Sequence, residues 1–314
     1  KGVGRLRAAV KSPLSDSLTS VRLCLTLREH SSLGAAQAMA AHDCCPPGAL
    51  GPAAEAPSAG RMEDLNGVPC YLVGSGPRCI VVGHDLFGVN SGRTKAICDI
   101  LAARLGCTVA VPSFFSGGAA GGEGASASLL RVLDPAPSEK WYSYPGRLGA
   151  MLWSVPGIYR GLKAVNWAAI RPKLYDSVLP ALKIRGVERF GLLGFCWGGW
   201  LTTRASAEPE FVCAAACHPS LMLASTLGDN EVALCNAVQC RTMFLASTGD
   251  PKNVRPGGLM QQAMEAKAFS KDCHFEAFPQ AHGWVNRGDL ANEELKRDYE
   301  KSVELLVGFY QKHL

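Results

Sequence analysis

The sequence contains no apolar run that approaches the roughly 20 residues of a membrane-spanning helix, which excludes a helical integral membrane protein. It also lacks a dense Lys/Arg stripe interleaved with aromatic residues, and its net charge is only +5, so nucleic acid is not an expected partner. Charged residues make up only 19% and hydrophobic residues 47% of the 314 residues, which excludes wholesale disorder. The chain is therefore expected to form one large or two ordinary globular domains.

Paired C-x2-C motifs with a second half at zinc spacing are missing as well. The 13 cysteines are odd in number and spread along the chain, and several lie in apolar runs such as FVCAAAC (211–217). This pattern favours small buried thiols in a reducing compartment, and hence a cytoplasmic protein. Cysteines lie close together in the sequence at three places, and none has the spacing of a metal site. These are Cys44-Cys45, Cys213 with Cys217 and His218, and Cys235 with Cys240.

Residues 1–60 differ in composition from the rest of the chain. The first 28 positions hold six Lys/Arg against one acidic residue, Asp16, and an Ala/Gly/Pro-rich stretch covers 48–60. A basic, serine-containing, acid-poor leader is typical of a transit peptide for an organelle, a chloroplast or a mitochondrion. A disordered tail, or upstream sequence ahead of a start at Met39, explains the composition equally well. We expect no core structure from this leader, and a globular domain over residues 61–314.

From about residue 62, short apolar strands alternate with amphipathic helices. This order predicts an α/β domain with a mostly parallel sheet covered by helices on both faces. The predicted strands are 79–83, 108–112, 190–194, 211–217, 242–247 and 273–278. The predicted helices are 93–106, 172–185, 198–207, 257–270 and 291–314. The Gly-rich stretch 117–124 lacks the Lys-Ser/Thr of a phosphate loop, so we expect a flexible loop there.

The segment GFCWG (194–198) carries the clearest chemical signal. It follows a predicted strand and precedes a predicted helix, which is the context of the nucleophile elbow G-x-S-x-G with cysteine in place of serine. The strained turn needs small residues on either side, and it places the Cys196 thiol at a helix N-terminus, where the thiolate is favoured. The backbone N–H of Trp197 is then expected to face the oxyanion of a reacting carbonyl. A second oxyanion N–H is expected from Leu86, in the loop HDLFGVN (84–90) after an early strand.

Two further residues complete a triad in the order nucleophile, acid, histidine. Asp250 lies in a turn just past the predicted strand 242–247, and His282 lies in a loop before the last predicted helix. Both positions belong to the carboxyl edge of a parallel sheet, where α/β proteins place their active sites. His218 also follows a predicted strand and could line the same pocket.

These motifs make the chain resemble the dienelactone hydrolase (carboxymethylenebutenolidase-like) family, which has the α/β-hydrolase fold. The similarity extends from about residue 42 to the end of the chain. CCPPG (44–48) resembles the start of some eukaryotic members. The most similar segments are HDLFGVN (84–90), CDILAARLGCTVAVPSFF (98–115), GFCWGG (194–199), Gly249-Asp250 and AHGWVNRGD (281–289).

The resemblance implies a Cys-His-Asp triad at specific positions. Cys196 is the implied nucleophile, His282 the base, and Asp250 the residue that orients the base. Asp85 takes the place of a glutamate that keeps the resting thiol protonated in the bacterial type enzyme, and it is one methylene shorter. The resemblance therefore implies that Asp85 is the partner of the resting thiol.

The substrate site is implied less directly. Arg287 is the expected partner of a substrate carboxylate, although its spacing from the histidine differs by one residue from the bacterial pattern, and Trp284 and Phe87 are further candidates for substrate binding. Ser113 stands where the family often has aspartate. The aromatic-rich stretch 134–160 has no clear counterpart and is either a lid over the pocket or a source of core aromatic residues.

The expected activity is hydrolysis of a small ester or lactone through a cysteinyl acyl-enzyme, by a monomer or weak dimer that requires no cofactor or metal. An alternative is a non-catalytic or thiol-redox protein on the same fold, with Cys196 as an oxidisable sensor. A third is a hydrolase of glycosidic bonds, a label carried by some plant relatives, although the sequence shows no recognisable pair of catalytic carboxylates. Ester turnover that depends on Cys196 separates the first interpretation from the other two.

Overall fold

The structure is a computed structural model, and it describes residues 45–46, 48–115 and 165–314. Most of the expected leader, the Gly-rich stretch 117–124 and the aromatic stretch 134–160 lie outside the described residues. The expectations for those segments stay predictions.

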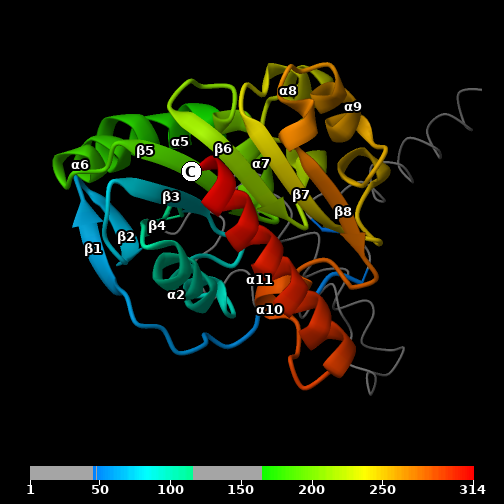
Figure 1. Ribbon diagram of the computed structural model, residues 1–314, viewed down its shortest axis with the longest axis horizontal. Helices are drawn as coiled ribbons and strands as arrows, with labels where there is room; N and C mark the ends of the chain where they lie inside the picture. The colour runs from blue at the N-terminus through cyan, green and yellow to red at the C-terminus, as the bar shows by residue number, and fades with distance from the viewer. Residues whose placement is uncertain (1–44, 47, 116–164) are drawn as a thin grey trace, which may run out of the picture. The chain divides into compact units, whose positions relative to one another are not determined.

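Within the described residues, eight strands form one sheet, drawn from blue to orange in Figure 1. The strands are β1 Arg61–Leu65, β2 Val68–Val73, β3 Arg78–Gly83, β4 Thr108–Pro112, β5 Arg189–Phe195, β6 Phe211–Cys217, β7 Arg241–Ser247 and β8 His274–Phe278. Their order across the sheet is β1-β2-β4-β3-β5-β6-β7-β8. Neighbours from β4 to β8 pair in parallel, whereas β2 pairs antiparallel with both β1 and β4. The predicted, mostly parallel sheet is confirmed.

Helices cover both faces of the sheet, because its central strands are apolar on both sides. The helices are α2 Thr94–Leu105, α5 Trp167–Pro172, α6 Leu179–Ile184, α7 Trp197–Ala205, α8 Glu231–Ala237, α9 Leu259–Glu265, α10 Trp284–Arg287 and α11 Glu293–His313, with the π-helical turn η2 Lys173–Val178 between α5 and α6. Short 3₁₀ turns are η3 Leu221–Leu223, η4 Lys252–Val254 and η5 Ser270–Asp272. One core cluster joins α2 and α11 to the sheet, and α11 crosses in front of it in Figure 1. The other cluster packs the helices α5, α6, α7, α8 and α9 against the opposite face of the sheet.

The antiparallel hairpin of β1 and β2 is absent from the sequence-based prediction. Its turn is Asn66-Gly67, at φ of 55° and 87°, and Leu65 pairs with Val68 across it. Both central residues have positive φ, which is the type I′ geometry that Asn-Gly favours in two-residue hairpins. The Asn-Gly pair between two short apolar segments is therefore the signal that could have revealed these strands.

The segment 48–60 lies in the expected leader by composition, yet it contacts the domain beside the predicted triad. The backbone N–H of Leu50 donates a hydrogen bond to the carbonyl of His282 at 2.8 Å. Further along, the N–H of Ala56 donates to the carbonyl of Gly92, also at 2.8 Å. Backbone hydrogen bonds thus anchor this segment at two points next to the carboxyl edge of the sheet.

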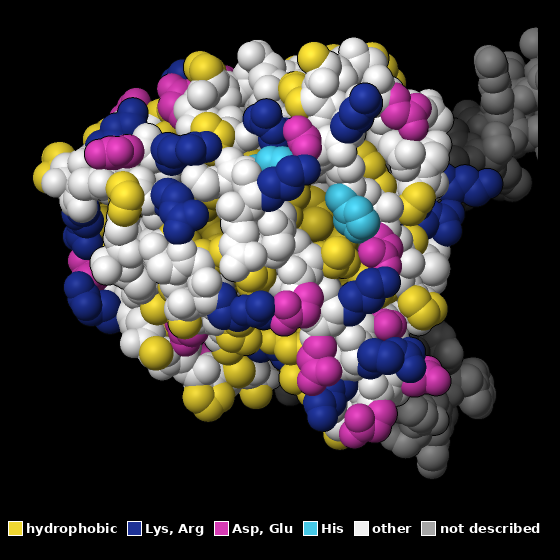
Figure 2. Space-filling view, in the orientation of Figure 1, with side chains coloured by type: hydrophobic (Ala, Val, Ile, Leu, Met, Phe, Trp, Pro, Cys, Tyr) yellow, Lys and Arg dark blue, Asp and Glu magenta, His cyan; other side chains and the backbone are white. Residues whose placement is uncertain are grey.

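Basic and acidic side chains are interspersed over the face shown in Figure 2. The ion pair between Lys312 of α11 and Asp272 of η5, at 2.7 Å, is an exposed example. Among the helices of the described residues, none is both long enough and apolar enough to cross a membrane.

Candidate active site

Cys196 occupies the turn between β5 and α7, with φ of 54° and ψ of −112°. Such a conformation is strained for any residue with a side chain, and it persists where the surroundings enforce it. The neighbouring glycines make the turn sterically possible. A Cβ atom at Gly194 would collide with the backbone of Gly198, and one at Gly198 would collide with the carbonyl of Gly83. The segment 194–198 thus has the local geometry of a nucleophile elbow.

Asp250 and His282 form a buried hydrogen-bonded pair at the same edge of the sheet. Asp250 follows β7, and one carboxylate oxygen accepts from Nδ1 of His282 at 2.7 Å. The other oxygen accepts from the backbone N–H of Ser247 at 2.7 Å, which fixes the carboxylate in its turn. Because Nδ1 is held in this way, Nε2 is the ring nitrogen of His282 that is available for chemistry.

The His282 ring also lies close to the thiol of Cys196. A ring nitrogen of His282 lies within 4.8 Å of Cys196 Sγ. Burial alone would lower the pKa of His282, but the negative charges of Cys196 and Asp250 outweigh it and raise the pKa to about 9. A hydrogen bond from Cys45 and the positive charge of His282 hold the pKa of Cys196 well below its usual value, although burial opposes them. These directions favour a thiolate–imidazolium pair.

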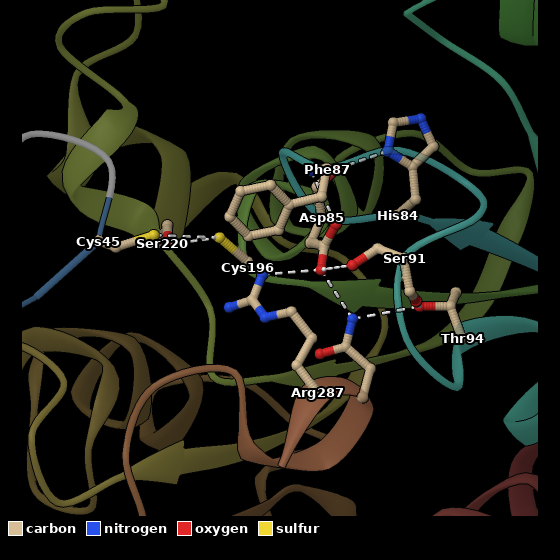
Figure 3. Close-up of polar contacts among 10 residues, drawn as sticks. Cys45, His84, Asp85, Phe87, Ser91, Thr94, Cys196, Ser220 and Arg287 are labelled. Carbon is tan, nitrogen blue, oxygen red and sulfur yellow. Dashed lines mark hydrogen bonds and ion pairs between the residues drawn. The ribbon is translucent and has the colours of Figure 1, made fainter. Parts of the chain in front are cut away.

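Two neighbours contact the sulfur of Cys196 directly (Figure 3). The Cys45 sulfur lies 3.8 Å away, and the hydroxyl of Ser220, just before η3, lies 3.4 Å away. Sequence reasoning missed both contacts. Cys45 comes 151 residues before Cys196, so no spacing pattern could have revealed that contact.

Asp85 is fully buried in the loop after β3, where four donors converge on its carboxylate. The backbone N–H of Phe87 donates to one oxygen at 2.9 Å. The other oxygen accepts from Ser91 at 3.1 Å, and from Asn286 and Arg287 at 2.8 Å each. These hydrogen bonds hold in place the loop that contains Leu86, the predicted source of an oxyanion N–H.

Arg287 is a buried cation with unused donors. Its Nη1 is committed to Asp85, whereas Nε and Nη2 make no hydrogen bond with the described residues. The guanidinium lies over the ring of Phe87, 4.6 Å from its centroid. Trp284 is fully buried and packs against Phe278, with 4.6 Å between the ring centroids. Of the three predicted substrate-binding residues, Arg287 and Phe87 are thus in contact with each other. Trp284 instead packs in the hydrophobic core.

Two histidines that carry no predicted catalytic role also line this edge. His84 is stacked on Trp197 with 5.6 Å between ring centroids, and its Nδ1 lies 2.7 Å from the carbonyl oxygen of Asp85. His218 lies edge-on to His282 at 4.9 Å, and neither of its ring nitrogens has a hydrogen-bond partner among the described residues. Burial lowers the pKa of both His84 and His218, which favours the neutral form of both rings.

The chain is similar to one known protein family and to several solved structures. The model of the dienelactone hydrolase family matches residues 71–313. A search of the curated proteins finds no match. Three solved structures are similar over most of the chain: a provisionally assigned dienelactone hydrolase from Klebsiella pneumoniae (18% identity, 81% of this chain and 98% of that chain, TM-score 0.48), an esterase from Pyrococcus furiosus (13%, 84% and 98%, 0.46) and a dienelactone hydrolase from Anabaena variabilis (11%, 82% and 98%, 0.45).

The strand order and the strained turn after β5 define an α/β-hydrolase fold, as the sequence predicted. Because the family model matches well over half of its residues, the chain belongs to the dienelactone hydrolase family. It is therefore a member of a family of hydrolases.

Proposed function

We propose that this chain hydrolyses a small ester or lactone through a covalent thioester on Cys196. One observation carries the proposal: Cys196, in its strained turn, lies close to the buried ring of His282. Nδ1 of His282 is hydrogen-bonded to Asp250 at 2.7 Å. This is the arrangement of nucleophile, base and orienting acid that acyl transfer needs.

In the proposed reaction the Cys196 thiolate attacks the carbonyl carbon, and the N–H groups of Trp197 and Leu86 stabilise the oxyanion. The tetrahedral intermediate collapses to a thioester, and the leaving alkoxide takes a proton from His282. His282 then removes a proton from water, which attacks the thioester and releases the acid and the thiolate. Asp250 orients the imidazole throughout.

The proposed substrate carries a carboxylate close to the reacting carbonyl. Support comes from Arg287, whose buried Nε and Nη2 have no hydrogen-bond partner among the described residues. A buried guanidinium with unused donors pairs well with a planar carboxylate. Phe87, under the guanidinium, supplies apolar contact for the same substrate.

The test is turnover of p-nitrophenyl acetate and of a dienelactone by the full chain and by Cys196→Ala. Loss of the nucleophile should lower the rate of both reactions by roughly a thousandfold or more. Cys273→Ala is the matched control, because Cys273 is a half-buried thiol that contacts Phe269 and Thr242 and lies outside the site.

Mass spectrometry of the quenched reaction should find one acyl group on the peptide that contains Cys196. Activity in Cys196→Ala equal to that of the unaltered chain, or an acyl group on a different residue, would contradict the proposed nucleophile. A preference for the dienelactone that persists in Arg287→Met would contradict the role of Arg287 while leaving the nucleophile in place.

A further inference from the structure

Three potential metal ligands from distant parts of the chain meet at the proposed nucleophile. The sulfurs of Cys45 and Cys196 and a ring nitrogen of His282 all lie within 4.8 Å of one another. Since Asp250 engages Nδ1, the nitrogen that remains is Nε2, which is buried and has no hydrogen-bond partner among the described residues. Two thiols and an unpartnered imidazole nitrogen are the donors that Zn²⁺ prefers.

The distance between the two sulfurs also matches a shared zinc ion. They are 3.8 Å apart, far beyond the roughly 2.05 Å of a disulfide bond. A tetrahedral zinc ion with Zn–S bonds of about 2.3 Å separates its two sulfurs by about 3.8 Å. The two thiols are therefore already spaced for coordination, and little movement is needed to seat the ion.

We propose that Cys45, Cys196 and His282 form a zinc site that competes with catalysis. Two thiolates and neutral Nε2 supply three ligands, and water takes the fourth position of the tetrahedron. Coordination requires two thiolates and an unprotonated Nε2, so zinc binding releases to solvent the proton of Cys45 and the proton shared by Cys196 and His282. Asp250 serves as the outer partner of the ligating histidine, because its bond to Nδ1 fixes the ring orientation and the tautomer.

The consequence for activity follows from the shared atoms and rests on the proposed function. Zinc would occupy the sulfur lone pair that attacks the carbonyl and the nitrogen that moves the proton, so acyl transfer would stop. Removal of the ion by a chelator would restore both groups unchanged. Metal binding itself does not depend on catalysis, so it can be measured separately.

The binding experiment uses the reduced, metal-free full chain, with Co²⁺ as a spectroscopic probe that Zn²⁺ displaces. We expect one Co²⁺ per chain, with thiolate-to-cobalt charge-transfer absorption. Loss of an outer-shell partner typically costs 10–100-fold in metal affinity, so loss of a ligand in Cys45→Ala should weaken Zn²⁺ binding at least that much. The control Cys273→Ala should bind as the unaltered chain does, because Cys273 is half-buried like Cys45 but lies outside the site. Equal affinity in Cys45→Ala, or no charge-transfer absorption in the unaltered chain, would overturn the proposal.

The activity experiment measures ester turnover against free Zn²⁺, followed by addition of a chelator. The zinc concentration for half-inhibition should rise in Cys45→Ala by the same factor as the dissociation constant, and the chelator should restore the rate in every active variant. Cobalt binding with no turnover in any metal-free protein would defeat the proposed function and leave the zinc site standing. Ester turnover by a protein that binds no metal would overturn the zinc site and leave the proposed function standing.

Discussion

In the proposed triad Asp250 acts on the thiol of Cys196 through His282, and this relay should have a measurable pH signature. The pKa of Cys196 lies below its usual value partly because His282 is positively charged, and Asp250 helps to raise the pKa of His282 to about 9. In Asp250→Asn the imidazolium loses a negative neighbour, so the pKa of His282 falls and that of Cys196 rises. At pH values below the thiol pKa, iodoacetamide should then alkylate Cys196 about tenfold more slowly for each pKa unit that the thiol gains.

The measurement is the pH profile of Cys196 alkylation, read by peptide mass spectrometry. Asp176→Asn is the control, because Asp176 is an exposed carboxylate on η2. Identical profiles for Asp250→Asn and the unaltered chain would remove Asp250 from the relay.

Asp85 is the predicted partner of the resting thiol, and its buried ion pair with Arg287 also bears on the stability of the fold. Its carboxylate and the guanidinium of Arg287 are both fully buried, 2.8 Å apart. Asp85→Asn leaves the cation of Arg287 without its counter-charge, which typically costs about 3–5 kcal/mol of unfolding free energy. The same change removes a negative charge from the site, so we expect Cys196 to alkylate faster at pH values below its pKa in the protein that remains folded.

Denaturant unfolding checks the first effect and the alkylation rate checks the second. The double variant with Arg287→Met should recover part of the lost stability, because the unpaired cation is gone. Unchanged stability in Asp85→Asn would contradict the buried pair. An unchanged alkylation rate would leave Asp85 as a purely structural residue of its loop.

At the level of single residues, the sequence singled out Cys196, Asp250 and His282, which the structure brings together, because each follows an apolar strand in a recognisable order. The contact between Cys45 and Cys196 and the role of Asn286 beside Asp85 could not be predicted in this way. Both depend on where loops distant in the sequence meet. Side chains in such loops have no periodicity that would indicate their direction.

Among the elements, the β1–β2 hairpin depends on one glycine at its turn. Gly67 is exposed with φ of 87°, and a Cβ atom there would meet nothing within 4 Å. Gly67→Ala should therefore lower the unfolding free energy by about 1–2 kcal/mol through backbone strain alone. Gly308 is also exposed with open space for a Cβ atom, but it lies inside α11, so Gly308→Ala should raise stability by roughly 0.5–1 kcal/mol.

Thermal or urea unfolding of the two variants checks these opposite signs. The pair controls for the change in side-chain size, because both substitutions add one methyl group at the surface. A stabilising Gly67→Ala would contradict the type I′ turn. A destabilising Gly308→Ala would contradict a regular α11 at that position.

Element prediction succeeded where apolar periodicity was strong and failed where elements were short. The six predicted strands and the helices α2, α7 and α11 are present nearly as expected. The four residues of α10 and the seven of α8 give too little periodicity to stand out. The predicted helix 257–270 is also shorter in the structure, since α9 ends at Glu265.

For the molecule as a whole, we expect amide hydrogen exchange to be slowest at the centre of the sheet. Among the described strands, β5 is paired on both sides and almost wholly buried, whereas β1 is an edge strand that pairs only with β2 and is largely exposed. Amides of β5 should exchange only through global unfolding, and those of β1 through local opening. Exchange followed by mass spectrometry checks this order, and Gly67→Ala should speed exchange in β1 more than in β5. Equal protection of β1 and β5 would contradict it.

The active centre draws on the loop after β3, the elbow and the residues after β7 and β8, and this arrangement matters while the chain is being made. Cys196 leaves the ribosome well before Asp250 and His282 do, so during synthesis its sulfur has neither the base nor the orienting acid beside it. A nascent or truncated chain that ends before His282 therefore carries an ordinary, weakly nucleophilic thiol. In the proposed mechanism His282 and Asp250 reach the thiol only when the C-terminal segments dock, so we expect the full reactivity of Cys196 to appear only after synthesis and folding are complete.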